Sequence, residues 1–94
     1  MPAEIKRIEI IIIGQVQGVL FRFYAKEQAE RLGVNGWAKN EPDGSVKIVA
    51  EGDEKRLQEF AAWCYNGPVN AKVAKTKVEW QKATGQFKEF SIRY

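Results

Sequence analysis

The sequence predicts an α+β fold in which two helices cover one face of a mostly antiparallel sheet that has a short final strand. Three observations lead to this prediction. The 94-residue chain contains β-branched runs that are typical of strands. Two other segments have apolar residues every three to four positions, which is typical of amphipathic helices. A turn sequence, EPDG, separates two strand-like segments in mid-chain. The resulting order β-α-β-β-α-β is that of a ferredoxin-like two-layer sandwich.

The first strand and helix are predicted from the N-terminal third of the chain. Residues 5–13, IKRIEIIII, become purely β-branched toward their end, and we expect a central strand that is buried on both faces. Residues 22–33 are expected to form a helix that stops at Gly33. The residues that recur on one face of this helix at 3.6-residue spacing are Phe21, Tyr24, Ala25, Gln28, Ala29 and Leu32.

A hairpin is predicted after this helix. Residues 35–40, NGWAKN, form its first strand and residues 45–51, SVKIVAE, its second. Between them, Pro42 presets φ for a turn and Gly44 tolerates a positive φ.

The last third supplies a second helix and two strands. Asp53 is expected to cap a helix over residues 54–66, which ends at the NG sequence before Pro68. Residues 72–82 alternate as a strand, and residues 90–94, FSIRY, form the short final strand. The side chains expected to point inward from the final strand are Phe90, Ile92 and Tyr94. The tryptophans expected in or against the core are Trp37, Trp63 and Trp80.

Length and composition limit the possible classes of protein. Residues 1–94 suffice for a single domain, and 45% apolar with 29% charged residues is ordinary for a globular chain. The fifteen Lys and Arg residues are scattered among twelve acids, and the resulting net charge of +3 does not indicate a nucleic-acid surface. No apolar run is long enough to span a membrane, and no leader is evident, so we expect a cytoplasmic protein. The sequence shows no obvious interface, and we expect a monomer.

The scarcity of cysteine and histidine excludes several kinds of site. The chain has no histidine, and Cys64 is its only cysteine. This composition rules out an internal disulfide, Ser–His and Cys–His nucleophilic sites, and zinc sites built on these residues. Cys64 falls on the apolar stripe of the second helix and is expected to be inert packing.

The segment GQVQGVLFR, Gly14 to Arg22, is a candidate anion site. The second helix opens with acids, whereas the first opens with Arg22 and has no acid before Glu27. A cation in a first helical turn is unfavourable by about 0.3–1 kcal/mol. Loop N–H groups, the helix dipole and the guanidinium can instead converge on a bound phosphate. The alternative is a tight strand-to-helix connection with a solvated arginine; no Lys-Ser/Thr pair follows Gly18, so the loop is not a Walker A motif.

Asn40 is the second candidate. It ends its predicted strand just before EPDG, where asparagine is also a favoured turn residue. The spacing alone leaves open whether it lies at the same end of the sheet as the loop. Glu41 and Asp43 beside it are expected to serve the turn, and Phe23 either lines the site or lies on the surface.

The two segments together resemble the acylphosphatase family. In GQVQGVLFR the family pattern is matched at Gly14, Val16, Gln17, Gly18, Val19, Phe21 and Arg22. In GWAKNEPDGSV it is matched at Gly36, Trp37, Ala38, Lys39, Asn40, Gly44 and Val46. AEGDE, GP and the closing FSIRY are also similar to the family, so the resemblance extends over nearly the whole chain.

The resemblance implies an enzyme that hydrolyses the carboxyl-phosphate bond of small acyl phosphates without a metal or cofactor. It implies that Arg22 grips the phosphoryl group and that Asn40 orients the attacking water. The loop residues implied to cradle the phosphate through their backbone are Gln15, Val16, Gln17, Gly18, Val19, Leu20 and Phe21. Leu20 stands where many members have a small residue and Gln15 where a basic one is frequent, so rate and substrate preference can differ.

Two alternatives share the predicted fold. One is a catalytically inactive phosphate-binding module. The other is an RNA-binding module, which stacks bases on aromatic side chains of its central strands. Neither IEIIII nor SVKIVAE contains an aromatic residue, so the sequence disfavours RNA and a nucleic-acid partner.

Overall fold

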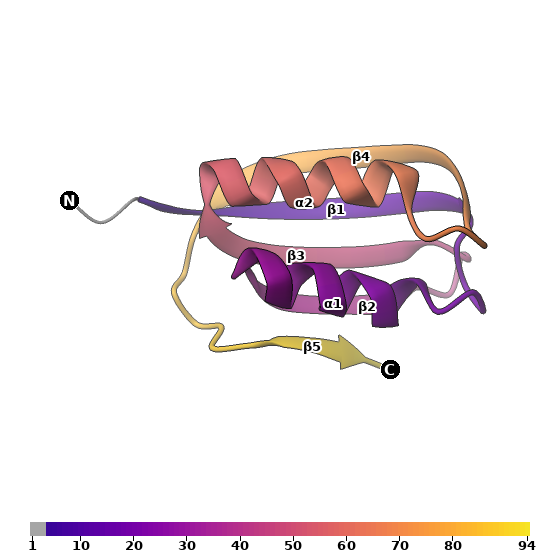
Figure 1. The fold of residues 1–94 in the computed structure, drawn as a ribbon, viewed down its shortest axis with the longest axis horizontal. Coiled ribbons are helices and arrows are strands. Elements are labelled where there is room, and N and C mark those ends of the chain that lie inside the picture. Colours follow the sequence, from indigo (N-terminus) through magenta and orange to yellow (C-terminus); the bar gives the residue numbers. More distant parts are fainter. Residues whose placement is uncertain (1–3) are drawn as a thin grey trace.

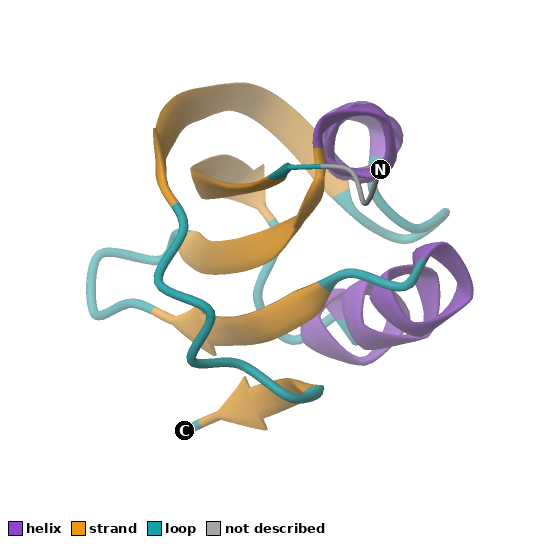
Figure 2. Cartoon of the chain, turned by 90° about the vertical axis from the view of Figure 1, so that its left-hand side faces the viewer, coloured by secondary structure: helices purple, strands orange, loops and turns teal. Residues whose placement is uncertain are grey.

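The computed structural model describes residues 4–94, which form a five-stranded sheet with both helices on one face (Figures 1 and 2). The elements in chain order are β1 (Ile5–Gln15), α1 (Phe21–Leu32), β2 (Asn35–Asn40), β3 (Val46–Asp53), α2 (Glu54–Asn66), β4 (Lys72–Lys82) and β5 (Phe90–Arg93). The strand order is β4-β1-β3-β2-β5, and every pair is antiparallel except β2 with β5. The predicted ferredoxin-like α+β fold is confirmed. In the described part of the chain, neither helix is long and apolar enough to cross a membrane.

The register brings the carboxyl ends of three strands together at one end of the sheet. Val46 of β3 lies opposite Ile12 of β1 on one side and opposite Asn40 of β2 on the other. With strands about 4.8 Å apart, Asn40 is roughly 10 Å from Ile12, which lies three residues before the end of β1. β5 runs parallel to β2, with Arg93 opposite Lys39. The ends of β1, β2 and β5 therefore meet at the edge where α1 begins, on the right in Figure 1.

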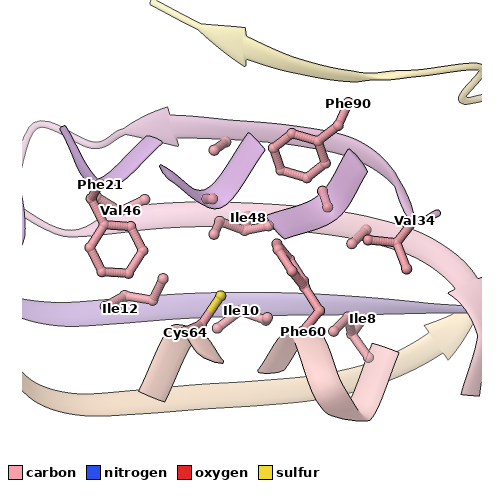
Figure 3. Close-up of a cluster of buried hydrophobic side chains, with 14 of the residues drawn as sticks. Ile8, Ile10, Ile12, Phe21, Val34, Val46, Ile48, Phe60, Cys64 and Phe90 are labelled. Atoms are coloured by element: carbon pink, nitrogen blue, oxygen red, sulfur yellow. The ribbon is translucent and has the colours of Figure 1, made fainter. Parts of the chain in front are cut away.

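The core fills the space between the sheet and the two helices (Figure 3). Alternate residues of β1 point toward the helices, and both helices contribute one apolar stripe. The Phe60 ring of α2 lies edge-on to the Phe90 ring of β5, with their centres 5.8 Å apart. The fully buried side chains between the layers include Ile8, Ile10, Ile12, Ala25, Ala29, Val46, Ile48, Leu57 and Cys64.

Several burial predictions were wrong, and the single covered face explains them. β1 is buried on its helix-facing side only, so Ile11 is half-buried and Ile13 is exposed. Trp80 faces the helix side, but β4 is an edge strand, and 43% of this residue is exposed. Tyr24 is also exposed. Tyr94 follows the last strand and is 94% exposed instead of pointing into the core.

The predicted boundaries of β2, α2 and β4 match the structure, and the others differ by one or two residues. β1 and β3 each extend two residues beyond the prediction, and β1 reaches Gln15 past a bulge at which β4 has one extra residue, Ala74. Gly14 makes this possible, because its φ is 141° and a Cβ there would lie 2.1 Å from the carbonyl oxygen of Lys72. The bulge carries the chain to the start of the candidate loop.

A buried carboxylate fixes the crossover from β4 to β5. Glu51 of β3 accepts hydrogen bonds from Thr84 N and Oγ1, at 2.9 and 3.1 Å, and from Gly85 N at 2.9 Å. Arg7 Nη1 lies 3.5 Å from the same carboxylate. Burial alone would raise the pKa of Glu51, but these donors and the Arg7 charge together lower it below its ordinary value of 4.5. The crossover is thus held in the position from which β5 pairs with β2.

We expect Glu51→Gln to lower the free energy of unfolding by about 1–3 kcal/mol, because an amide NH₂ would face a backbone N–H group in place of an acceptor. A folded-state pKa below the unfolded value stabilises the protein above about pH 4.5, and that stability is lost as the pH falls through the folded pKa. Urea titrations at several pH values should therefore show the two proteins converging in acid. Glu54→Gln, which removes an exposed ion pair with Lys6, is the matched control with an expected loss below about 1 kcal/mol. An equal loss at all pH values would contradict this explanation.

Candidate active site

The two helices begin differently, and the difference marks the site. Asp53 caps α2 by accepting a hydrogen bond from Arg56 N at 2.9 Å, and Glu54 follows in the first turn. The N-cap residue of α1 is Leu20, whose side chain forms no cap, and the first turn contains no acid. Leu20 has φ 62° and ψ 27°, a left-handed conformation that costs a non-glycine residue about 1–2 kcal/mol. The positive end of the α1 dipole is therefore not neutralised by its own first turn.

The loop before α1 presents unpaired backbone donors. Within residues 4–94, none of the N–H groups of residues 17–23 donates a hydrogen bond of good geometry. Gly18 has φ 75°, and the space where its side chain would lie is open. A residue with a Cβ would be strained there and would partly fill that space. Backbone donors at a helix N-terminus, with open space beside them, suit an anionic ligand.

Gln17 ties this loop to the β2–β3 turn. Its Nε2 donates hydrogen bonds to the carbonyl oxygens of Glu41, at 2.7 Å, and Ser45, at 2.9 Å. The turn follows Asn40 directly, so one side chain links the two segments singled out from the sequence. The side chain of Gln17 thus serves to position the loop, a role that the sequence analysis did not identify.

We expect Gln17→Ala to lower kcat/KM for benzoyl phosphate about tenfold, because small displacements of groups that position a substrate are costly. The free energy of unfolding should fall by about 1–2 kcal/mol, because the Glu41 and Ser45 oxygens each keep a hydrogen bond from a backbone N–H group of the turn. Gln28→Ala is the matched control, because Gln28 accepts hydrogen bonds from Arg31 on α1, away from the loop. Initial rates and urea titrations measure both quantities. Wild-type kcat/KM in Gln17→Ala would refute a positioning role.

The last two residues of the sequence, Arg93 and Tyr94, contact the Arg22 side chain. Its Nη1 donates a hydrogen bond of 2.9 Å to the backbone oxygen of Arg93, which is 71 residues away in sequence. The Tyr94 ring lies with its centre 4.9 Å from Cζ of Arg22, within cation–π range. Within the described chain, no carboxylate pairs with Arg22. The guanidinium is thus fixed on one side while its remaining N–H groups are left for a ligand.

A cavity of about 310 Å³ lies at this edge of the sheet and is lined by both candidate residues, Arg22 and Asn40. The loop and the start of α1 contribute Val16, Gly18, Leu20, Phe21 and Phe23. The end of the chain contributes Ile92 and Tyr94. The lining contains no acid, so Arg22 is its one charged side chain. Of the other loop residues named from the sequence, Gln15 lies in β1 opposite Lys72, Gln17 contacts the turn, and Val19 packs against the core.

Asn40 and the two C-terminal residues reach the cavity through the sheet register. Asn40 is half-buried at the end of β2, and its side chain forms no hydrogen bond with any described residue. Its amide is therefore available to a ligand or to water.

Sequence reasoning placed Phe23 beside the site as one of two options and did not identify Ile92 or Tyr94. Their signal would have been the pairing of the last strand with β2, which the pattern of FSIRY does not specify.

The remaining candidate groups have structural roles. Asp43 accepts hydrogen bonds from Ser45 Oγ at 2.6 Å and Ser45 N at 2.9 Å, and these bonds lower its pKa. Burial raises the pKa of the Cys64 thiol, so this group stays protonated and is a poor nucleophile. Among residues 4–94, no three His, Cys, Asp or Glu side chains are grouped as metal ligands. The central strands β1 and β3 carry no aromatic side chain on the open face, in contrast to RNA-binding relatives of the fold.

Comparisons of the sequence and of the structure with known proteins point to the same family. The acylphosphatase family model matches residues 8–92. An acylphosphatase of Pelotomaculum thermopropionicum is 43% identical over 88 residues, which are 94% of this chain and 96% of that protein. The crystal structure of acylphosphatase from Bacillus subtilis is similar with a TM-score of 0.91 at 38% identity and covers 95% of this chain and 99% of that one. Full-length HypF in its phosphate- and nucleotide-bound form contains a similar unit, with a TM-score of 0.90 and 26% identity, which is 100% of this chain but 12% of HypF.

Proposed function

Because the chain belongs to the acylphosphatase family and is therefore a hydrolase acting on acyl phosphates, we propose that the cavity beside α1 is its active site. The main support is that Arg22 and Asn40, which lie on different elements, line one cavity that contains no acid. The substrate is a small acyl phosphate, whose phosphoryl group enters the positive end of this cavity.

Phosphate binding is the role of the loop and Arg22. Of the predicted loop 15–21, the backbone N–H groups of residues 17–21 donate hydrogen bonds to the phosphoryl oxygens together with those at the start of α1, whereas Gln15 is paired with Lys72 in the sheet. The guanidinium adds a planar pair of donors and a full positive charge. Its contact with the backbone oxygen of Arg93 holds it in place before substrate arrives, so little side-chain entropy is lost on binding.

Asn40 positions the nucleophile. Its amide oxygen accepts a hydrogen bond from a water molecule and aims the water oxygen at phosphorus, in line with the leaving group. The water–phosphorus bond forms as the bond between phosphorus and the carboxyl oxygen breaks. The bonding electrons leave with the carboxylate, and the proton of the water passes to solvent.

The chemistry of the substrate explains why these groups suffice. An acyl phosphate is an activated anhydride, and its leaving carboxylate needs no proton, so no strong general acid is required. Phosphoryl transfer depends mainly on positioning and on stabilisation of charge at the equatorial oxygens. Arginine, backbone N–H groups and an amide provide both functions in a chain without histidine.

We expect the purified protein to hydrolyse benzoyl phosphate at the same rate with and without excess EDTA. The proposed roles of Arg22, Asn40 and the loop N–H groups supply the charge stabilisation that a metal would otherwise give. The decay of benzoyl phosphate can be followed by its ultraviolet absorbance, with the uncatalysed rate subtracted. Activity that disappears with EDTA and returns with a divalent cation would contradict the proposal.

The monomeric state, the cytoplasmic location and the single-domain organisation expected from the sequence remain predictions. An RNA-binding role is disfavoured, because β1 and β3 carry no stacking residue on the open face of the sheet. The aromatic residue on that face of β2, Trp37, is half-buried and its ring lies against the Arg93 guanidinium.

A further inference from the structure

Three exposed apolar side chains gather at the mouth of the cavity. Leu20 is 64% exposed and Phe23 is 48% exposed, and both line the cavity together with Tyr94. An acyl phosphate has a charged phosphoryl half and an acyl half. If Arg22 holds the phosphoryl half, the acyl half lies toward this mouth.

Leu20 is in an unfavourable backbone conformation without a compensating gain from burial. Within residues 4–94 it is the one non-glycine residue with a positive φ. A glycine would adopt φ 62° without strain, and a leucine side chain that is mostly in water gains little from packing. Strain at an exposed position beside a ligand cavity indicates a functional side chain.

Phe23 and Tyr94 are the other two apolar residues that line the cavity near its opening. Phe23 lies in the first turn of α1 and lines the same cavity as Leu20, the residue that precedes the helix. The Phe23 ring is steadied by an edge-on contact with Tyr24, with ring centres 5.3 Å apart. The Tyr94 ring lies against the Arg22 guanidinium, so one of the apolar walls is next to the phosphate-binding group.

We infer that Leu20, Phe23 and Tyr94 form an apolar rim that selects acyl phosphates with an aromatic or bulky apolar acyl group over small or charged ones. This inference rests on the proposed function, because it assumes that Arg22 binds the phosphoryl half. Leu20 is the specificity-determining residue of the rim. The rim carries no charged group that could pair with a charged acyl chain, so such a substrate would lose hydration there without a compensating contact.

The test compares kcat/KM for benzoyl phosphate and acetyl phosphate in the wild type, Leu20→Ala and Leu20→Gly. We expect the benzoyl-to-acetyl ratio of kcat/KM to fall about tenfold in both variants, since one lost apolar contact changes selectivity by roughly that factor. Leu20→Gly alone should also raise the urea midpoint, because only glycine relieves the strained backbone. Val69→Ala removes an exposed apolar side chain outside the cavity lining and should leave the ratio unchanged.

Inorganic phosphate separates the two halves of the site, because it has no acyl group. Its inhibition constant should change much less in Leu20→Ala than kcat/KM for benzoyl phosphate does. An unchanged benzoyl-to-acetyl ratio, or an equal loss for both substrates with equally weakened phosphate inhibition, would overturn the inference. Failure of the proposed function has a different signature, namely undiminished hydrolysis of both substrates when Arg22 and Asn40 are each replaced.

Discussion

Arg22→Ala is expected to reduce kcat/KM for benzoyl phosphate about a thousandfold, the low end of what an arginine contributes to phosphoryl transfer. The residue lines the cavity as its one charged side chain, so nothing else in the lining replaces its charge. Inhibition by inorganic phosphate should weaken as well, because the ground state and the transition state both carry phosphoryl charge. Arg22→Lys should recover only part of the loss, since an ammonium lacks the planar pair of donors.

The controls for Arg22 separate catalysis from folding. Arg31→Ala changes an arginine on the same helix that donates hydrogen bonds to Gln28 and is not part of the cavity lining, and its kcat/KM should match that of the wild type. Urea titration should show that Arg22→Ala remains folded, because it loses one hydrogen bond and one cation–π contact, both at an exposed site and together worth about 1–2 kcal/mol. Wild-type rates in a folded Arg22→Ala protein would exclude Arg22 as the phosphate-binding residue.

Asn40→Ala should lower kcat about a hundredfold, because a misplaced nucleophile reduces rate by roughly that factor. The inhibition constant of inorganic phosphate should stay close to the wild-type value, since Asn40 is proposed to hold water and not the phosphoryl group. Asn40→Asp should instead weaken phosphate inhibition, because a carboxylate beside the anion repels it. Initial rates over a range of substrate and phosphate concentrations distinguish the two effects.

Asn35→Ala is the matched control, because Asn35 begins the same strand at the end opposite the cavity. The combination of the Arg22 and Asn40 results is more informative than either alone. A loss of phosphate inhibition in Asn40→Ala as large as in Arg22→Ala would mean that Asn40 binds the phosphoryl group and that the water is positioned by another residue.

The fold was predictable from the sequence because it depends on local patterns. Arg22 was singled out by such a pattern, whereas the role of Asn40 came from the family resemblance, and both roles remain predictions. Residues recurring at 3.6-residue spacing predicted both helices, and the turn residues of EPDG predicted the hairpin. The absence of acids from Gly14 to Arg22 pointed to an anion. Only the strand register shows that Asn40 and Arg22 share a cavity. Val46 of β3 is paired with Ile12 of β1 on one side and with Asn40 of β2 on the other, so β1 and β2 end at the same end of the sheet.

The features that were not predicted depend on contacts between distant segments. The hydrogen bond from Arg22 to Arg93 needs the parallel pairing of β5 with β2, and FSIRY has the same alternation at either edge of a sheet. Leucine disfavours a positive φ, so no propensity rule places Leu20 in the left-handed region. The double burial expected of β1 was wrong because the β-branched run indicates a strand but does not show how many of its faces are covered.

The position of β1 in the sheet also governs how the chain must fold. Its partners are β3 and β4, both far along the chain, and β5 must still join β2 before Arg93 can reach Arg22. Such distant pairings raise the contact order, so a mixed fold of this kind is expected to fold more slowly than a helical bundle. While the ribosome is still making β4, the isoleucine run of β1 has an open edge, which is the kind of segment that aggregates. The strand that finally covers this edge contains Lys72, Lys75, Lys77 and Lys82, and these charges discourage a second chain from adding to the finished sheet.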